Sequence, residues 1–203
     1  MAGDDRELIL RFVSAFGRLD DLVSSSSAVH GDLSPLLLLP ADPDDWTEWR
    51  PIPADLPREA LQELYECVPG PLPPLYERLI LSYRWAEVEL VRLRLLANLP
   101  PGLRGLTAGI TNDPVLFETL LTAGFVQFGK GWDMDYDPVC FDLHGRQADG
   151  DCRVVKFDHE EILCNRHLEE VSELAPSFRR LVELVVEDAG KAPPQTYLRG
   201  SEG

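Results

Sequence analysis

Residues 131–143 read GWDMDYDPVCFDL and join an acidic stretch to an apolar run. The aspartates occupy alternate positions: Asp133, Asp135 and Asp137. An EF-hand calcium loop begins with this spacing, but it also requires glycine at its sixth position and glutamate at its twelfth. Here those positions hold Pro138 and His144, so the segment is not a calcium loop. The apolar run that follows instead predicts a short strand.

Apolar runs of similar length flank this segment and predict further strands. GFVQFG spans residues 124–129, DPVCFDL spans 137–143 and CRVVKFD spans 152–158. All three are rich in β-branched and aromatic residues, and turn-forming residues separate them. Alternation in WAEVELVRLRLL, residues 85–96, predicts a fourth strand. We expect these strands to form a central, mostly antiparallel sheet.

Helical periodicity surrounds the predicted sheet, because apolar residues recur there at three- and four-residue steps. The expected helices are residues 4–23, 57–68, 75–83, 113–121 and 169–187, the last with a break at Pro176. The proline- and glycine-rich residues 98–114 are expected to be a loop. Helices that flank a central sheet make the predicted fold an α+β domain.

Proline content divides the chain into parts. Residues 1–54 are expected to be an extension, a helix followed by a proline-rich loop with an acidic patch around Trp46 and Trp49. The LLLL run in that loop is expected to be a buried strand or an anchor. Residues 55–188 form the predicted main domain, and residues 189–203 are expected to be a disordered tail.

The chain is strongly acidic: 35 Asp and Glu residues against 19 Lys and Arg give a formal charge of -16. Such a charge repels nucleic-acid phosphates and anionic lipids and attracts basic partners, although it also serves solubility. We therefore expect a protein partner, and neither nucleic acid nor a membrane. The N-terminus lacks the features of a secretory signal, and no apolar run reaches the roughly 18 residues of a membrane span, so a cytoplasmic location is expected.

The sequence contains no recognisable catalytic or metal-binding motif. It has no nucleophile elbow, phosphate-binding loop or metalloprotease helix motif, and its four cysteines form no C-x-x-C pair. We expect those cysteines to be buried thiols. The sequence thus predicts no enzyme, no cofactor and no metal site.

One enzymatic alternative rests on Asp158, His159 and Cys164. His159 could act as a general base held by the neighbouring carboxylate. It could also be a histidine at a strand end that is hydrogen-bonded to the backbone, and we favour this structural role.

The acidic stretch is expected to be a loop that leads into the central strand and rims a surface. Trp132 and Tyr136 would supply rigid aromatic contact area there, and Asp133, Asp135 and Asp137 would supply charge for a partner. In the structural alternative, the aromatic side chains lie in the core and the aspartates form turns.

The order of several motifs resembles the SUKH superfamily, which includes fungal cell-wall-synthesis regulators and many bacterial immunity proteins. ADLPREALQELY and PLPPLYERLI resemble its leucine–proline and tyrosine helices, and VVKFDHE resembles its V-x-x-x-D-H-E strand. The resemblance covers roughly residues 55 to 188 and implies a SUKH-like α+β fold. Its motif residues include Asp142, Asp158, His159, Ser177 and Phe178.

Local chemistry agrees with structural roles for these motif residues. Asp142 and Asp158 each follow an apolar strand, where a carboxylate can accept backbone N–H groups in the ensuing turn. Ser177 is expected to cap the last helix, and Phe178 is expected to anchor that helix in the core.

The resemblance implies a non-enzymatic protein-binding module. By similarity to the bacterial members, it would neutralise a toxin domain, often a nuclease, whose basic cleft an acidic surface can cover. The alternative is a regulatory or scaffold protein of the same fold, which would bind through residues 1–54 and use the N-terminal helix and the Trp46/Trp49 segment as its contact.

Overall fold

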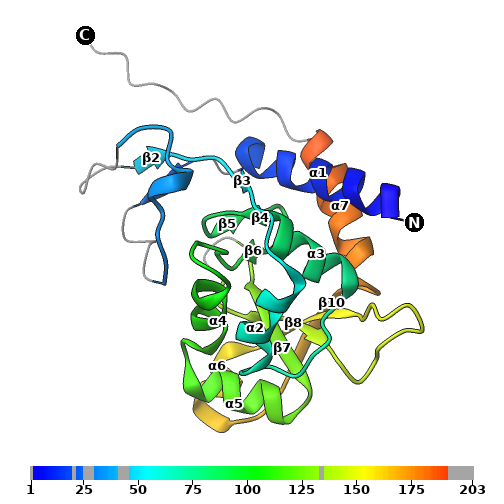
Figure 1. Ribbon diagram of the computed structural model, residues 1–203. Helices are drawn as coiled ribbons and strands as arrows, with labels where there is room; N and C mark the ends of the chain where they lie inside the picture. The colour runs from blue at the N-terminus through cyan, green and yellow to red at the C-terminus, as the bar shows by residue number, and fades with distance from the viewer. Residues whose placement is uncertain (1, 20–21, 25–29, 41–45, 133–134, 192–203) are drawn as a thin grey trace.

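A six-stranded antiparallel sheet forms the centre of the protein (Figure 1). The computed structural model describes residues 2–19, 22–24, 30–40, 46–132 and 135–191. The sheet is a meander whose strands are neighbours in chain order, β10-β9-β8-β7-β6-β5. Their bounds are β5 Val88–Glu89, β6 Arg94–Leu95, β7 Phe125–Lys130, β8 Pro138–Asp142, β9 Val154–Phe157 and β10 Glu170–Ala175.

Helices cover both faces of this sheet, which confirms the predicted α+β class. They are α1 Ala2–Leu19, α2 Leu61–Tyr65, α3 Pro74–Ser82, α4 Arg104–Thr111, α5 Pro114–Thr122, α6 His159–Asn165 and α7 Phe178–Lys191. α3 and α7 pack on one face as part of the main core, while Leu120 of α5 and Ile162 of α6 pack on the other face. Among the described residues, no helix has the length and apolar character needed to cross a bilayer.

Burial on both faces explains the apolar sequence of β8. All five of its residues are buried. Successive side chains of a strand point to opposite faces, so Val139 and Phe141 enter the main core while Cys140 enters the smaller cluster beneath α5 and α6. A strand covered on both sides favours apolar residues along its length, and Pro138–Phe141 meet that need, while the buried Asp142 at its end is hydrogen-bonded to His144 N and Arg153.

The three strands predicted at residues 124–129, 137–143 and 152–158 are confirmed as β7, β8 and β9. The fourth prediction, a single strand over residues 85–96, is wrong in the number of strands. That segment is a hairpin of two short strands, β5 and β6, closed by a hydrogen bond from Leu90 N to Leu93 O of 2.8 Å.

The loop predicted over residues 98–114 contains a helix, α4. Leu106 and Ile110 are buried at helical spacing on its inner face. Gly105 is required by packing, since a Cβ atom there would lie 2.6 Å from the backbone oxygen of His30. Gly105, one of the glycines that suggested a loop, therefore permits close contact between segments.

The helix predicted over residues 169–187 is wrong in its first part, where the chain forms β10. Val171 and Leu174 are three residues apart, as on a helix face, but two register shifts interrupt the pairing of β10 with β9. These irregularities break the two-residue period that marks a strand. The helix α7 begins only after Pro176.

Asp151 holds the start of α7 from a distant loop. Its Oδ1 accepts a hydrogen bond from Phe178 N at 2.9 Å, and its Oδ2 accepts one from Arg179 N at 3.1 Å. The expected cap by Ser177 is also confirmed, because its Oγ accepts from Arg180 N at 3.1 Å. Phe178 is only 1% exposed, so its predicted role as a core anchor is confirmed.

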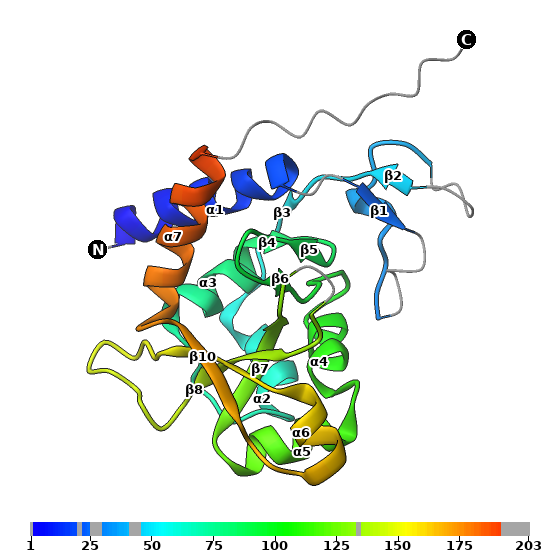
Figure 2. The ribbon, with the colours of Figure 1, turned by 180° about the vertical axis from the view of Figure 1, so that it is seen from behind.

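The N-terminal helix α1 lies against α7, as Figure 2 shows. Asp5 accepts hydrogen bonds from both Arg78 of α3 and Arg179 of α7, and Phe16 is fully buried against Trp85. The helix of the predicted extension therefore contributes to the core shared with residues 55–188. It ends at Leu19, short of the predicted residue 23.

The segment between α1 and α2 is less regular. It contains β1 Leu22–Ser24, β2 Trp46–Glu48, β3 Ile52–Pro53 and two short 3₁₀ turns, Ser34–Leu36 and Arg58–Ala60; β3 pairs with β4 Tyr83–Arg84. Of the LLLL run, Leu36 is the buried anchor, while Leu38 and Leu39 are exposed.

At the C-terminal side of the chain, residues 189–191 complete α7, so the tail was predicted to begin too early. Residues 192–203 lie outside the described residues.

Replacing Asp151 with alanine should cost about 3 kcal/mol of unfolding free energy, because buried backbone amides lose their acceptor. Ser177→Ala removes a single cap bond and should cost about 1 kcal/mol. Urea denaturation of both variants measures the difference. Equal losses would contradict a leading role for Asp151.

Candidate functional site

Hydrogen bonds join the described parts of the connection between β7 and β8, residues 131–132 and 135–137. Gly131 N donates to Asp137 O at 2.8 Å, which extends the β7–β8 ladder by one bond. The Asp135 side chain folds over Gly131, where a Cβ atom would lie only 2.2 Å from its carboxyl group. Glycine is therefore needed at this position for the loop to close.

Two of the three predicted aspartates tie this loop to its neighbours. Asp135 Oδ2 accepts a hydrogen bond from Lys156 Nζ of β9 at 2.6 Å. Asp137 Oδ1 accepts one from His159 N at 2.9 Å and lies 2.8 Å from His159 Nδ1, at the start of α6. Both carboxylates thus have structural roles, and any role in binding a partner stays a prediction; Asp133 lies outside the described residues.

Trp132 and Tyr136 lie on the surface, so the part of the structural alternative that placed them in the core is wrong. Its other part is confirmed for Asp135, whose Oδ1 accepts a hydrogen bond from Asp137 N at 2.8 Å and so forms a turn. Trp132 is 52% exposed and Tyr136 is 49% exposed. The Tyr136 ring is supported on two sides, with the Arg94 guanidinium 5.7 Å from its centroid and the His159 ring edge-on at 6.2 Å. The loop therefore presents two large aromatic side chains from a braced backbone.

The Lys156 contact shifts the pKa of Asp135. Burial raises the pKa of this carboxyl group, but the hydrogen bonds from Lys156 and from the Asp137 amide, together with the charge of Lys156, outweigh burial and bring the pKa below its ordinary value. Asp135 therefore stays ionised at neutral pH, and its bond to Lys156 is a charged one.

Ligand atoms of Asp135, Asp137 and His159 lie within 4.8 Å of one another, close enough to share a metal ion. The Lys156 ammonium already lies against both carboxylates, 2.6 Å from Asp135 and 3.5 Å from Asp137. An ammonium group is a poor neighbour for a second cation. The chemistry of this cluster is that of an ion pair that fixes the loop.

The enzymatic alternative paired His159 with Asp158, but the carboxylate that contacts the His159 ring is that of Asp137. Asp158 Oδ1 accepts a hydrogen bond from Glu161 N at 3.0 Å and caps α6, and Cys164 is exposed further along the same helix. Within the described residues, neither belongs to the cluster of possible metal ligands that contains His159. His159 was expected at a strand end, but it opens the helix α6, which the sequence analysis missed.

Asp142 confirms its predicted turn role. Its Oδ1 accepts from His144 N at 3.0 Å and Gly145 N at 3.2 Å, while Oδ2 accepts from Arg153 Nε at 2.7 Å.

The prediction that all four cysteines are buried is correct for two of them. Cys140 and Cys152 are buried, whereas Cys67 and Cys164 are exposed. 

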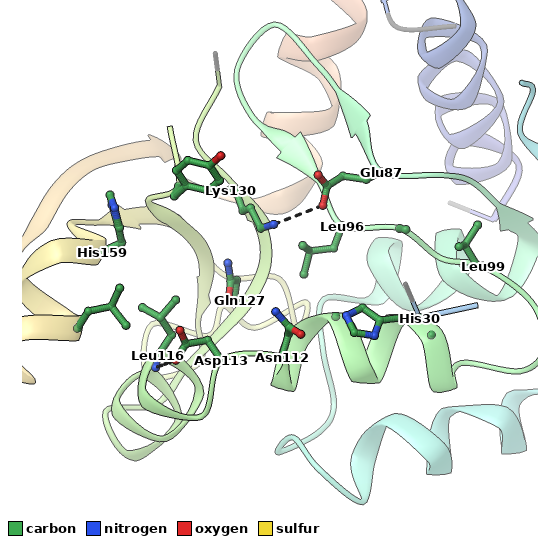
Figure 3. A pocket seen from close by; sticks show the side chains of 15 residues that line it. His30, Glu87, Leu96, Leu99, Asn112, Asp113, Leu116, Gln127, Lys130 and His159 are labelled. Atoms are coloured by element: carbon green, nitrogen blue, oxygen red, sulfur yellow. Dashed lines mark hydrogen bonds and ion pairs between the residues drawn. The ribbon is translucent and has the colours of Figure 1, made fainter. Parts of the chain in front are cut away.

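A cavity of about 550 Å³ opens beside Tyr136 and His159 (Figure 3). Its polar lining comes from separate parts of the chain and includes His30, Glu87, Asn112, Asp113, Gln127 and Lys130. None of these residues was predicted from the sequence to form a site, although Asp113 was predicted to begin a helix. The one available signal was Gln127, a polar residue inside the apolar run GFVQFG.

Comparison with known proteins adds no family to this description. No protein-family model matches the chain, and no curated protein sequence matches it. The SUKH resemblance therefore stays a proposal based on the motifs of this sequence.

The Asp135–Lys156 pair should stabilise the protein in a pH-dependent way. A folded-state pKa below the unfolded value gives stability that is present above about pH 4 and is lost as the pH falls through the folded pKa. A double-mutant cycle with Asp135→Asn and Lys156→Met measures the coupling free energy at each pH. We expect a stabilising coupling at pH 7 that disappears in acid; a coupling that does not change with pH would contradict this assignment.

Proposed function

We propose that this chain is a non-enzymatic protein-binding module whose contact surface is centred on Trp132 and Tyr136. The observation that carries the proposal is the half-exposure of both aromatic side chains on a loop fixed by Asp135 and Asp137. Large aromatic residues are the commonest hot spots of protein interfaces.

The bracing of the loop supports this role. Ordering a loop on binding costs conformational entropy, which reduces affinity. The bonds from Lys156 and His159 impose that order before a partner arrives. Tyr136 is restrained further by Arg94. A partner would therefore meet a largely preformed aromatic surface.

Charge near the loop favours a basic partner. The carboxylates of Asp135 and Asp137 are partly balanced by Lys156, but Glu160 and Glu169 are exposed and carry no ion pair within the described chain. Glu160 follows His159 directly, and Glu169 O accepts the hydrogen bond from Asp158 N, which places both glutamates close to the loop. With a net charge of -16 overall, the protein would attract and orient a cationic partner.

The SUKH resemblance suggests what that partner would be. Bacterial members of the superfamily neutralise toxins, so we propose a basic, nuclease-type toxin domain as the partner of this surface. An acidic surface with aromatic anchors suits such a target, because enzymes that bind phosphates present basic clefts.

The alternative contact through residues 1–54 is less well supported by geometry. Trp49 is fully buried, and the apolar face of α1 packs into the core. Of the aromatic residues that this alternative names, Trp46 is the exposed one, at 63%. Trp46 therefore serves as a matched control for Trp132.

Affinity measurements on single variants test the proposal. A partner is first captured from the native host with the wild-type protein, purified, and titrated by calorimetry against each variant. Trp132→Ala and Tyr136→Ala should each weaken binding by about 30-fold, the loss typical of an interface hot spot. Trp46→Ala should change the affinity less than about twofold.

The reverse pattern, in which Trp46→Ala weakens binding and Trp132→Ala does not, would support the N-terminal contact instead. Charge is tested separately with Glu160→Lys, which should slow association with a basic partner. An unchanged association rate would contradict the charge argument.

A further inference from the structure

The cavity beside Tyr136 has the size of a site for a small molecule. Its volume of about 550 Å³ far exceeds that of one side chain, and pockets for small organic ligands span roughly 300–1,000 Å³. Leu96, Leu99 and Leu116 give it apolar walls. An apolar body of a ligand could therefore be buried there.

Gln127 supplies a buried hydrogen-bond acceptor to this cavity. The side chain is only 8% exposed, and it lines the cavity. Its Nε2 donates to Gly129 O at 3.0 Å, which fixes the orientation of the amide because a carbonyl oxygen can only accept. In the described parts of the chain, no group donates to Gln127 Oε1. This oxygen is therefore available to a donor inside the cavity.

Asp113 adds a negative charge on the same side of the cavity. Figure 3 shows Asn112 and Asp113 on one side of Gln127 and the Glu87–Lys130 pair on its other side. One oxygen of Asp113 caps α5 by accepting from Val115 N at 2.9 Å and Leu116 N at 3.1 Å. Among the described residues, no cation forms an ion pair with Asp113, so its charge has no side-chain counterpart.

The groups around Glu87 on the opposite wall carry more positive than negative charge. Glu87 lies 3.5 Å from both Lys130 Nζ and Arg94 Nη1. One carboxylate therefore already faces two cations, and a third cation would gain little there. The cavity thus has one side that favours a cationic donor and another that does not.

We propose that this cavity binds a small molecule with one amine or amidine head on an apolar body. The head would donate to Gln127 Oε1 and to the Asp113 carboxylate, and the body would contact Leu96, Leu99 and Leu116. Hydrogen bonds with a charged partner are stronger than neutral ones, so the site discriminates by charge as well as by shape. This inference is independent of the proposed protein partner.

A series of three matched probes tests the charge preference. The ¹⁵N-labelled full-length protein is titrated by NMR with 4-phenylbutylamine, 4-phenylbutanol and 4-phenylbutyrate. The amine should bind at least about tenfold more tightly than the carboxylate, with the alcohol between them. The shifts should map to the Gln127 side-chain amide and to the backbone of Gly105 and Gly109, which line the cavity.

Three variants assign the two acceptors. Asp113→Asn keeps a helix-capping side chain but removes the charge, so it should weaken amine binding about tenfold and spare the alcohol. Glu118→Gln is the control, because it makes the same charge change at an exposed position of α5 that does not line the cavity, and it should leave all affinities unchanged. Gln127→Leu should weaken the amine and the alcohol, which both donate, and spare the carboxylate.

Equal affinity for the three probes, shifts that map elsewhere, or an unchanged amine affinity in Asp113→Asn would each overturn the proposal. The absence of saturable binding would overturn it as well. Should Gln127→Leu not fold, as its thermal melt would reveal, the probe series and Asp113→Asn still decide the question. No partner protein is used, so a negative result here leaves the role of Trp132 and Tyr136 untouched.

Discussion

A cluster of four aromatic rings joins the sheet to its helices, and the other features of the fold depend on it. Phe128 and Phe141 stack with ring centroids 4.0 Å apart, and Phe178 meets both rings edge-on. Tyr76 of α3 closes the cluster. Each such ring buries about 150–250 Å², so the cluster contributes far more to the stability of the fold than the exposed ion pairs do.

The large stabilisation that these packed rings provide explains why the cluster tolerates a buried polar group. The Tyr76 hydroxyl is buried and has no hydrogen-bond partner among the described residues, and its burial raises the pKa of Tyr76. An unmatched hydroxyl costs roughly 1–3 kcal/mol. The packing of the ring against three neighbours more than offsets this cost. By fixing β7 and β8 in register, the same packing sets the ends from which the Trp132–Tyr136 loop extends.

Sequence patterns predicted the elements whose signal is local and missed those that depend on tertiary contacts. The strands β7, β8 and β9 are apolar runs between turns, and Asp113 marks the start of α5 as expected. The helix α4 was missed because Gly105 packs against the backbone of a distant segment. Strand β10 was missed because two register shifts in its pairing with β9 break the two-residue alternation by which a strand is recognised in a sequence.

The candidate site shows the same division between local and tertiary signals. The loop was visible as one stretch of sequence, whereas the cavity combines side chains from positions 30 to 163, which only the folded chain brings together.

The contact between α1 and α7 bears on the order in which the protein is made. Phe12 and Phe16 lie on the buried face of α1, and α1 packs against α7, the last helix of the described chain. During translation this apolar face leaves the ribosome long before α7 exists. Contacts so distant in sequence form slowly, and surfaces exposed in the meantime invite aggregation. Asp5, whose charge both Arg78 and Arg179 later bind, and the other acidic groups near the start of α1 would keep the nascent segment in solution until the closing helix arrives.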